Sequence, residues 1–175
     1  MGKPKKQQVL PMVSICTPTF NRRPFIPMII KCFEHQLYPK DRMEWIIIDD
    51  GTDKIGDLVS HIPQVKYFKY DEKMTLGKKR NLLHEKSKGD ILVYMDDDDY
   101  YPSDSIELRV RALLSNQASC VGTTMLGCMN LHNFECYSIG SRVSVLAEAS
   151  MAYKKSFWES RPFREDVYTG EAVHF

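Results

Sequence analysis

The sequence predicts a single α/β domain, a three-layer sandwich with a mostly parallel central sheet and helices on both faces. Short apolar runs alternate with helical patterns along the early half, and the run at residues 90–95 is almost continuously apolar at its centre. Alternating strands and helices favour parallel pairing, and a strand buried on both faces is typical of such a sheet. The length of 175 residues suits one domain. We expect residues 1–8 to be a flexible basic tail and residues 9–175 to be the domain.

The elements are predicted in order from local pattern. Branched and aromatic residues gather where strands are expected, at residues 9–17, 43–48, 65–70, 90–95, 119–130 and 137–145. Pro18 is expected to end the first strand, because a proline cannot continue a paired ladder. Apolar spacing close to 3.6 residues indicates helices at residues 28–37, 53–60, 76–87 and 106–114.

Composition excludes several classes of protein. Lys and Arg total 24 against 23 for Asp and Glu, a net charge of +1, which argues against nucleic acid as a partner. Hydrophobic residues make up 43% of the chain, so it is not wholly disordered. No apolar run approaches the ~20 residues of a membrane span, and no secretory signal is recognisable. The five cysteines include no Cys-x-x-Cys, so we expect free thiols and a cytoplasmic protein.

Two acidic clusters each follow a predicted strand: Asp49-Asp50 and Asp96-Asp97-Asp98-Asp99. In parallel sheets, ligands bind beyond the carboxyl ends of the strands, so both clusters should line one crevice with residues 17–21. Clustered carboxylates select hard cations, and Mn²⁺ or Mg²⁺ would bridge them to phosphates. The alternatives are a solvated acidic turn for the second cluster and ordinary turn chemistry for the first.

Two further side chains are candidates for nucleotide contact. Phe20 could stack on a flat base, although a loop aromatic more often serves packing. Arg80, near the start of a predicted helix, could reach a base or a phosphate, although an exposed helical arginine is usually solvated.

Four segments together resemble the successive motifs of family-2-type glycosyltransferases with the GT-A (Rossmann-like) fold. They are residues 13–22 (VSICTPTFNR), 48–51 (IDDG), 77–81 (GKKRN) and 93–99 (VYMDDDD). The resemblance runs from about residue 13 to residue 175. The chain, including its end GEAVHF, also resembles glycosyltransferase domains of large algal DNA viruses, which implies a location in the host cytoplasm if the protein is viral.

The resemblance implies a nucleotide-sugar donor, with a UDP-sugar favoured. Asp98 would be the direct metal ligand, and Asp96 or Asp97 would hold the ribose or metal-bound waters. The nucleotide-binding residues implied by position are Thr17, Pro18, Thr19 and Phe20 around the base and ribose, Asp49 at the uracil edge, Arg80 near the nucleotide, and Asp96 and Asp97.

Inverting transfer also needs a base that takes the proton of the acceptor hydroxyl. The resemblance places it late in the chain, where Glu171 fits best and Asp166 competes. His174 could complete the metal shell beside Asp98 and Asp96. Residues 147–153 and Trp158 are expected on the sugar and acceptor side, although Trp158 is more simply explained as core.

The predicted activity is therefore metal-dependent transfer of a sugar, with inversion, to a glycan or other hydroxyl acceptor. A nucleotidyltransferase could use the same aspartates, but no glycine-rich phosphate loop is present. A non-catalytic module that binds nucleotide sugars or glycans is the remaining alternative.

Overall fold

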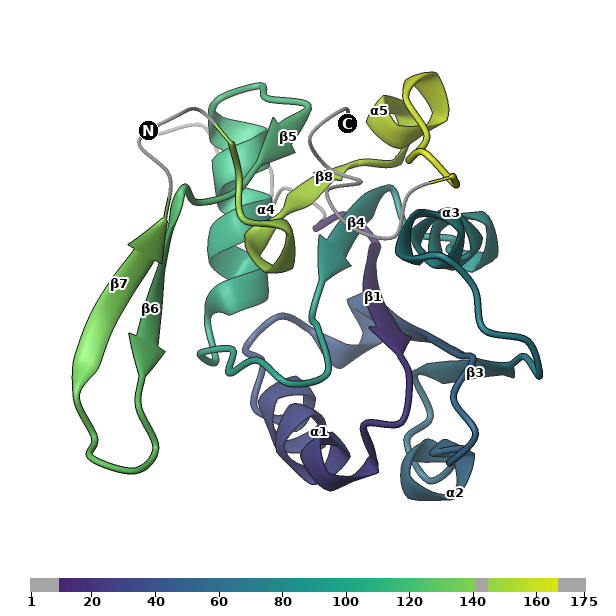
Figure 1. The fold of residues 1–175 in the computed structure, drawn as a ribbon. Coiled ribbons are helices and arrows are strands. Elements are labelled where there is room, and N and C mark those ends of the chain that lie inside the picture. Colours follow the sequence, from purple (N-terminus) through teal and green to yellow (C-terminus); the bar gives the residue numbers. More distant parts are fainter. Residues whose placement is uncertain (1–9, 141–144, 167–175) are drawn as a thin grey trace, which may run out of the picture.

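The computed structural model describes residues 10–140 and 145–166, which form an α/β fold in three layers (Figure 1). The main sheet has six strands in these residues. In order across the sheet they are β3 (Val65–Lys69), β2 (Met43–Asp49), β1 (Val13–Thr19), β4 (Ile91–Tyr94), β8 (Ala152–Lys154) and β5 (Cys120–Val121). The first four are mutually parallel, whereas β8 is antiparallel to both β4 and β5. The predicted mostly parallel sheet is confirmed.

Helices cover both faces of the sheet, as predicted. Hydrophobic clustering places α1 (Ile26–Glu34), α2 (Gly56–Val59) and α4 (Ser105–Ser115) on one face. The same criterion places α3 (Leu76–Lys86) and α5 (Lys155–Ser160) on the other face. Single 3₁₀ turns lie at η1 (Arg23–Phe25), η2 (Lys40–Arg42) and η3 (Glu148–Ser150). None of the helices in the described residues is long and apolar enough to span a membrane.

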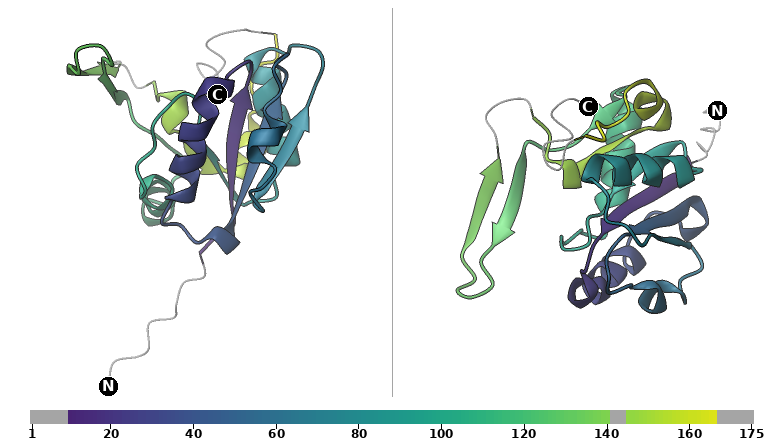
Figure 2. Two further views of the ribbon diagram at one scale, coloured as in Figure 1. Left: turned by 90° about the horizontal axis from the view of Figure 1, so that it is seen from below. Right: turned by 45° about the vertical axis from the view of Figure 1, so that its right-hand side comes forward.

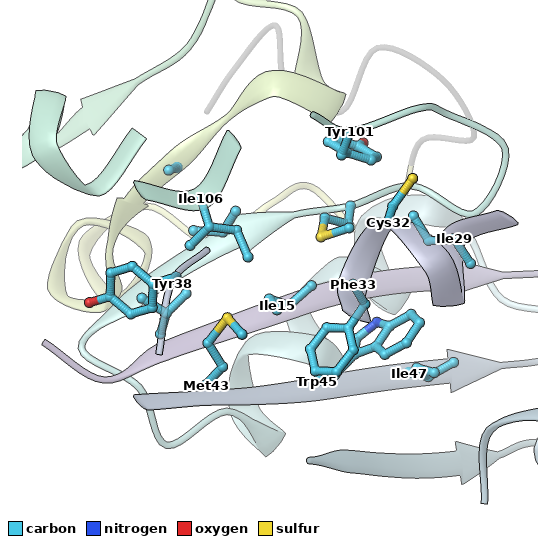
Figure 3. Packing of buried hydrophobic residues seen from close by; sticks show 14 of the residues in the cluster. Ile15, Ile29, Cys32, Phe33, Tyr38, Met43, Trp45, Ile47, Tyr101 and Ile106 are labelled. Atoms are coloured by element: carbon cyan, nitrogen blue, oxygen red, sulfur yellow. The ribbon is translucent and has the colours of Figure 1, made fainter. Parts of the chain in front are cut away.

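The core under α1 shows how the strands separate the two faces. Side chains alternate along a strand, so Ile15 points to the α1 face and its neighbour Cys16 to the α3 face. The rings of Phe33 and Trp45 stack with centroids 4.8 Å apart, beside Ile15 (Figure 3). Burying one such side chain contributes roughly 1.5–3 kcal/mol, so this face anchors the first two strands.

The first strand begins later and ends later than predicted, because β1 passes through Pro18 to Thr19. The expectation that Pro18 ends the strand is wrong. Pairing with β4 stops at Cys16, whereas pairing with β2 continues to Thr19. Pro18 therefore lies where β1 has a partner on one side only, and a proline is tolerated at such an edge.

The predicted strand at residues 119–130 is divided in two. β5 joins the main sheet, while β6 (Met125–Met129) pairs with β7 (Cys136–Gly140) in a separate hairpin. Thr123 turns the chain between them, because its N–H donates to Ser150 Oγ (2.9 Å) and its carbonyl accepts from Ala147 N (2.7 Å). The hairpin projects away from the rest of the fold (Figure 2), on the side of α4 (Figure 1).

Strand β8 was not predicted. It overlaps the end of residues 147–153, which the sequence assigns to the acceptor side, and it is inserted between β4 and β5. α2 is also shorter than the predicted helix at residues 53–60. Trp158, on α5, donates from Nε1 to Asn81 Oδ1 (3.0 Å) and packs against the second core cluster.

The carboxylate of Glu44 is buried at the amino-terminal end of the sheet, opposite the carboxyl ends of its parallel strands. The Glu44 carboxylate accepts hydrogen bonds from Ser14 Oγ, Lys66 Nζ and Lys88 N. Burial opposes its charged form, but these donors outweigh that cost and lower the pKa of Glu44 from 4.5.

Candidate functional site

A cleft of ≈ 570 Å³ lies at the carboxyl ends of β1 and β4, against the first turns of α3. This is the edge of the sheet at which the sequence predicts ligand binding. The cleft brings together segments that are far apart in the sequence. Its lining residues are Pro18, Thr19, Phe20, Asn21, Arg22, Lys73, Met74, Leu76, Lys79, Arg80, Asp96, Asp97 and Asp98.

Thr17 and Asp49 are not among the lining residues. The Thr17 hydroxyl donates to Met95 O (2.6 Å) and accepts from Trp45 Nε1 (2.8 Å) within the core. The hydroxyl thus links β1 to the Trp45 side chain of β2 and to the residue after β4, and Thr17 is buried. The predicted contact of Thr17 with the nucleotide is untested, and the geometry favours a structural role.

Asp49 is fully buried at the end of β2. Its Oδ1 accepts from Gly51 N (2.9 Å), and its Oδ2 accepts from Ile55 N (3.0 Å) and the Tyr67 hydroxyl (2.6 Å). These bonds fix the turn after β2 and its path into α2. The predicted contact with the base stays a prediction, because this carboxylate already serves three donors of the protein.

Asp50, the next residue, is also buried and, contrary to the expectation, does not line the cleft, but it contacts Lys79, which does. Lys79 Nζ forms an ion pair with Asp50 Oδ1 and donates to Thr19 O (3.1 Å). Asp50 Oδ2 accepts from Met74 N (2.7 Å). The buried Lys79–Asp50 pair therefore connects the end of β1, the loop after β2 and the start of α3.

Phe20 is the aromatic side chain of the cleft. Lys73 Nζ lies 4.4 Å from its ring centroid and Lys79 Nζ lies 5.8 Å away. Ammonium groups at these distances are attracted by the ring face. An aromatic surface with cations beside it can bind a base and the phosphates attached to it.

Asn21 holds the same loop in a constrained conformation. Its φ of 55° is left-handed, and its Oδ1 accepts from Thr52 N (2.7 Å) and Asp53 N (3.0 Å). Gly51 is required opposite it, because a Cβ there would lie 2.5 Å from Asn21 N. The loops after β1 and β2 are thus locked together.

Arg80 is a buried cation in the wall of the cleft, with only 2% of its side chain exposed. Its guanidinium carbon lies 4.2 Å from the Tyr94 ring centroid. Its terminal nitrogens approach Asp96 Oδ1 (3.9 Å) and Glu148 Oε2 (3.5 Å). A planar cation at this depth suits a diphosphate, whose oxygens it can contact in pairs.

A buried aromatic layer supports the Tyr94 ring under Arg80. The Tyr94 and Tyr153 hydroxyls each lie 2.9 Å from His84 Nε2, and Tyr153 donates to Tyr94 at 3.1 Å. Burial, with repulsion from Arg80, lowers the pKa of His84 well below 6.5, so the imidazole is neutral. The layer fixes Tyr94 without adding a second charge beneath the arginine.

The four aspartates follow β4 in a loop anchored by Tyr101. The Tyr101 hydroxyl accepts from Asp96 N (2.8 Å) and donates to Ala149 O (3.1 Å), which ties the loop to η3. Burial, with added repulsion from Asp98 and Asp96, raises the pKa of Asp97 to about 6. Burial and the same neighbours also raise the pKa of Asp99.

Arginine partners offset part of this negative charge. Arg22 Nη2 lies 3.2 Å from Asp98 Oδ2, and Arg22 Nε lies 3.9 Å from Asp97 Oδ1. Arg80 Nη1 likewise lies 3.9 Å from Asp96 Oδ1. The cleft therefore contains cationic and anionic side chains in contact with one another.

Comparison with known proteins identifies the domain that carries this cleft. A profile named "Glycosyl transferase family 2" matches residues 14–160. The chain belongs to this family. The match includes β4, α3, all of β1 except Val13 and all four aspartates, so every cleft residue lies inside the family domain.

Three individual proteins illustrate the similarity. An uncharacterized glycosyltransferase of Haemophilus influenzae is 30% identical over 112 residues, covering 61% of this chain and 44% of that protein. The mannosyltransferase PcManGT of Pyrobaculum calidifontis, solved with GDP-Man and Mn²⁺, aligns with a TM-score of 0.76 at 20% identity. TarS 1–349 of Staphylococcus aureus, solved with UDP-GlcNAc, aligns with a TM-score of 0.74 at 18% identity.

The structural matches cover 94% and 92% of this chain but 51% of each partner chain. The chain thus spans about half the length of these structures. At these identities the two structures show the fold, and they confirm the predicted GT-A architecture. These relatives are bacterial or archaeal, and they give the expected viral resemblance no support.

The fit of the family's divalent cation depends on Asp96–Asp98. Asp97 Oδ2 is buried with no hydrogen-bond partner in the described part of the chain, as expected of an atom that awaits a ligand. No group of three or more His, Cys, Asp or Glu side chains forms a ready metal cage among residues 10–140 and 145–166. Mg²⁺ commonly takes only one or two protein carboxylates and completes its shell with phosphates and waters, so the residues present fit such an ion.

The late residues predicted for catalysis are only partly described. Glu171 and His174 lie outside the described residues, so their roles stay predictions. Asp166 is exposed and accepts from Arg164 Nε (3.0 Å) and Nη2 (2.6 Å), and it does not line the cleft. The segment before it packs on α3 so closely that a Cβ on Gly77 would lie 1.9 Å from Arg164 O.

Asn21 is expected in the crevice only as part of residues 17–21, and five further cleft residues are not singled out by the sequence: Arg22, Lys73, Met74, Leu76 and Lys79. Asn21 and Arg22 stand in the first resembling segment, and Lys79 stands in the third, so position in a motif was the available signal. Lys73 has no such signal, because a lone lysine in a polar loop is usually solvated.

Proposed function

We propose that this family 2 domain binds a nucleoside diphosphate sugar in the cleft and transfers the sugar to an acceptor hydroxyl with inversion. Uridine diphosphate is the favoured carrier, and Mn²⁺ or Mg²⁺ is the favoured cofactor. The observation that carries the proposal is the composition of one cleft: an aromatic ring beside ammonium groups, a buried arginine and three consecutive aspartates. The TarS complex with UDP-GlcNAc and the PcManGT complex with GDP-Man and Mn²⁺ support it by analogy.

Different residues of the cleft bind different parts of the nucleotide sugar in this proposal. The Phe20 ring offers a face to the base, and the backbone of Pro18 and Thr19 borders the ribose. Arg80 binds the diphosphate from within the wall, where it lies over the Tyr94 ring. Asp98 is the proposed direct metal ligand, and Asp96 or Asp97 accepts hydrogen bonds from the ribose or from metal-bound water.

The proposed bond changes are those of an inverting transfer. The acceptor oxygen attacks the anomeric carbon from the face opposite the diphosphate, and the bond from that carbon to the diphosphate oxygen breaks. The acceptor proton passes to Glu171 or, in the competing assignment, to Asp166. A divalent cation, when bound, neutralises the charge that the diphosphate gains as it leaves.

Family membership leaves the nucleotidyltransferase alternative without support. A non-catalytic module with the same fold remains an outcome of the test. The cytoplasmic location expected from the cysteine content stays a prediction.

The binding test is a thermal shift with UDP. UDP should raise the melting temperature with Mn²⁺ or Mg²⁺ present, and Asp98→Ala should abolish the shift. Asp71→Ala, which removes an exposed aspartate outside the cleft, is the matched control and should keep it. An equal shift in EDTA would contradict the metal-bridged arrangement.

The catalytic test uses Glu171→Gln. This variant should keep UDP-sugar binding and lose transfer to an acceptor, with Asp166→Asn as the competing variant. Undiminished transfer by Glu171→Gln would place the base elsewhere. A screen of nucleotide sugars, read as hydrolysis, identifies the donor, and binding of every donor without any turnover would indicate a non-catalytic module.

A further inference from the structure

Two arginines line the donor cleft, and they differ in how far their side chains can move. Arg80 lies in the wall against the Tyr94 ring, with 2% of its side chain exposed. Arg22 lies beside the aspartates, with 45% of its side chain exposed. Exposed side chains change rotamer within nanoseconds, whereas a close-packed interior restrains them. Of the two arginines, Arg22 is therefore the one that can exchange its partners.

The backbone of Arg22 is held in place although its side chain is exposed. Asn21, the residue before it, has a φ of 55° and accepts hydrogen bonds from Thr52 N and Asp53 N. The residue after it begins the turn η1, which contains Pro24. The loop therefore presents the guanidinium group to the aspartates from a fixed position.

The guanidinium group of Arg22 lies against two of the carboxylates of the proposed metal site. Its Nη2 is 3.2 Å from Asp98 Oδ2, and its Nε is 3.9 Å from Asp97 Oδ1. The Asp97 side chain is only 7% exposed, so little water can solvate its charge. Arg22 thus supplies positive charge to both carboxylates.

A divalent cation and Arg22 compete for Asp98. Mg²⁺ binds carboxylate oxygens at about 2.0–2.1 Å, so an ion on Asp98 would lie roughly 5 Å from the guanidinium group in its present position. Charges of +1 and +2 at roughly that separation repel each other enough, even at the dielectric constant of water, to weaken binding about tenfold. The cation therefore binds tightly only when the guanidinium group moves away.

Two other partners are within reach of the Arg22 side chain. The first is the ring of Phe25, whose centroid lies 5.5 Å from the guanidinium carbon and whose face attracts a cation. The second is the diphosphate of the donor, which the proposed function places in the same cleft. A diphosphate is the stronger partner, because it is charged and can accept paired hydrogen bonds from a guanidinium group.

We propose that Arg22 couples the binding of the two ligands. It holds Asp97 and Asp98 until the donor enters, and it moves to the diphosphate as the cation takes Asp98. This inference rests on the proposed function, because the diphosphate is the partner that draws the side chain away. It follows that the cation binds weakly alone and tightly together with the nucleotide.

The test is Mn²⁺ binding without nucleotide, measured from the electron paramagnetic resonance signal of the free ion. Arg22→Gln should bind Mn²⁺ about tenfold more tightly than the unaltered protein, because the competing charge is gone. A variant that merely misfolds would lose affinity rather than gain it. Arg22→Lys keeps the charge and should gain less than Arg22→Gln.

Arg23→Gln is the matched control. Arg23 is the next residue and also pairs with two carboxylates, those of Asp53 (2.8 Å) and Asp57 (2.9 Å), but it does not line the cleft. Removing its charge should leave the affinity for Mn²⁺ unchanged. Equal tightening by Arg22→Gln and Arg23→Gln would indicate a general effect of net charge and would overturn the inference.

Calorimetry with UDP gives a second readout. The factor by which Mn²⁺ strengthens UDP binding should be about tenfold smaller in Arg22→Gln than in the unaltered protein, because binding couplings are reciprocal. Tighter Mn²⁺ binding with an unchanged factor would overturn the inference, because Arg22 would then oppose the cation whether or not the nucleotide is bound.

The outcomes separate this inference from the proposed function. If UDP with Mn²⁺ leaves the melting temperature of the unaltered protein unchanged, the donor site itself is contradicted. If that shift holds, an Mn²⁺ affinity that Arg22→Gln leaves unchanged or weakens overturns the inference alone. Failure of both proteins to bind Mn²⁺ without nucleotide overturns it as well, because Arg22 would then not be what opposes the cation.

Discussion

Asp49→Asn tests whether this carboxylate is structural or contacts the base. The wild-type group accepts three hydrogen bonds, from Gly51 N, Ile55 N and the Tyr67 hydroxyl, with none of its surface exposed. We expect the variant to lose stability while the folded protein keeps its affinity for UDP.

The magnitude follows from the two oxygens of the carboxylate. Asparagine keeps one acceptor oxygen, so its NH₂ group must face either Gly51 N–H or the pair formed by Ile55 N–H and the Tyr67 hydroxyl. One or two buried donors then lack an acceptor, and each costs roughly 1–3 kcal/mol. A loss of about 2–4 kcal/mol is large against the roughly 5–15 kcal/mol by which domains are stable.

Urea unfolding measures the free energy, and calorimetry with Mn²⁺ measures the affinity for UDP. Asp53→Asn is the matched control, because Asp53 pairs with Arg23 on the surface (2.8 Å) and should cost only about 0–1 kcal/mol. The structural reading is refuted if Asp49→Asn unfolds like the unaltered protein and binds UDP about tenfold more weakly.

Three further substitutions test other parts of the molecule. Phe20→Leu should weaken UDP binding about fivefold to 150-fold by calorimetry, because base stacking contributes roughly 1–3 kcal/mol, and a normal affinity would exclude stacking. Glu44 has a lowered pKa in the folded state, so its ionised form stabilises the fold above pH 4.5 and less as pH falls below it. In urea unfolding, the wild-type protein should be more stable than Glu44→Gln by a margin that shrinks as pH falls below 4.5. A margin that stays constant with pH would contradict this. Tyr94→Phe keeps the ring under Arg80 but removes hydrogen bonds to His84 and Tyr153, so it should lower stability by about 1–3 kcal/mol and leave UDP affinity intact; weaker UDP binding would give the hydroxyl a direct role.

The sheet and the position of the cleft were predictable because both follow from local pattern. Continuous apolar runs mark β2 and β4 as buried on both faces, and parallel strands bring their carboxyl ends to one edge. β8 was not predictable in the same way. β8 has only three residues, and it is a strand because it pairs with β4 and β5. No local sequence pattern encodes that pairing.

Side-chain direction explains which predicted residues reach the cleft. Thr17 shares the face of Val13 and Ile15, which point to α1, whereas Pro18 shares the face of Cys16, which points to α3. On β2, Asp49 follows Ile47 onto the α1 side, and Asp50 follows Ile48 onto the side of Lys79. Because successive side chains of a strand alternate, Thr17 and Asp49 turn away from the cleft, whereas residues 18–22 and 96–98, at and beyond the strand ends, line it without a break.

The net charge of +1 gives no sign that the cleft contains several cationic and anionic side chains, which pair with one another. Arg22 pairs with Asp98, and Arg80 stands beside Asp96. A diphosphate bound alone would attract the arginines and leave the carboxylates without a positive partner. A divalent cation bound alone would be repelled by the arginines. Bound together, the two ligands supply a partner for every charge. Each should therefore strengthen the binding of the other, by the same factor in both directions, which is why the UDP shift is expected to require the metal.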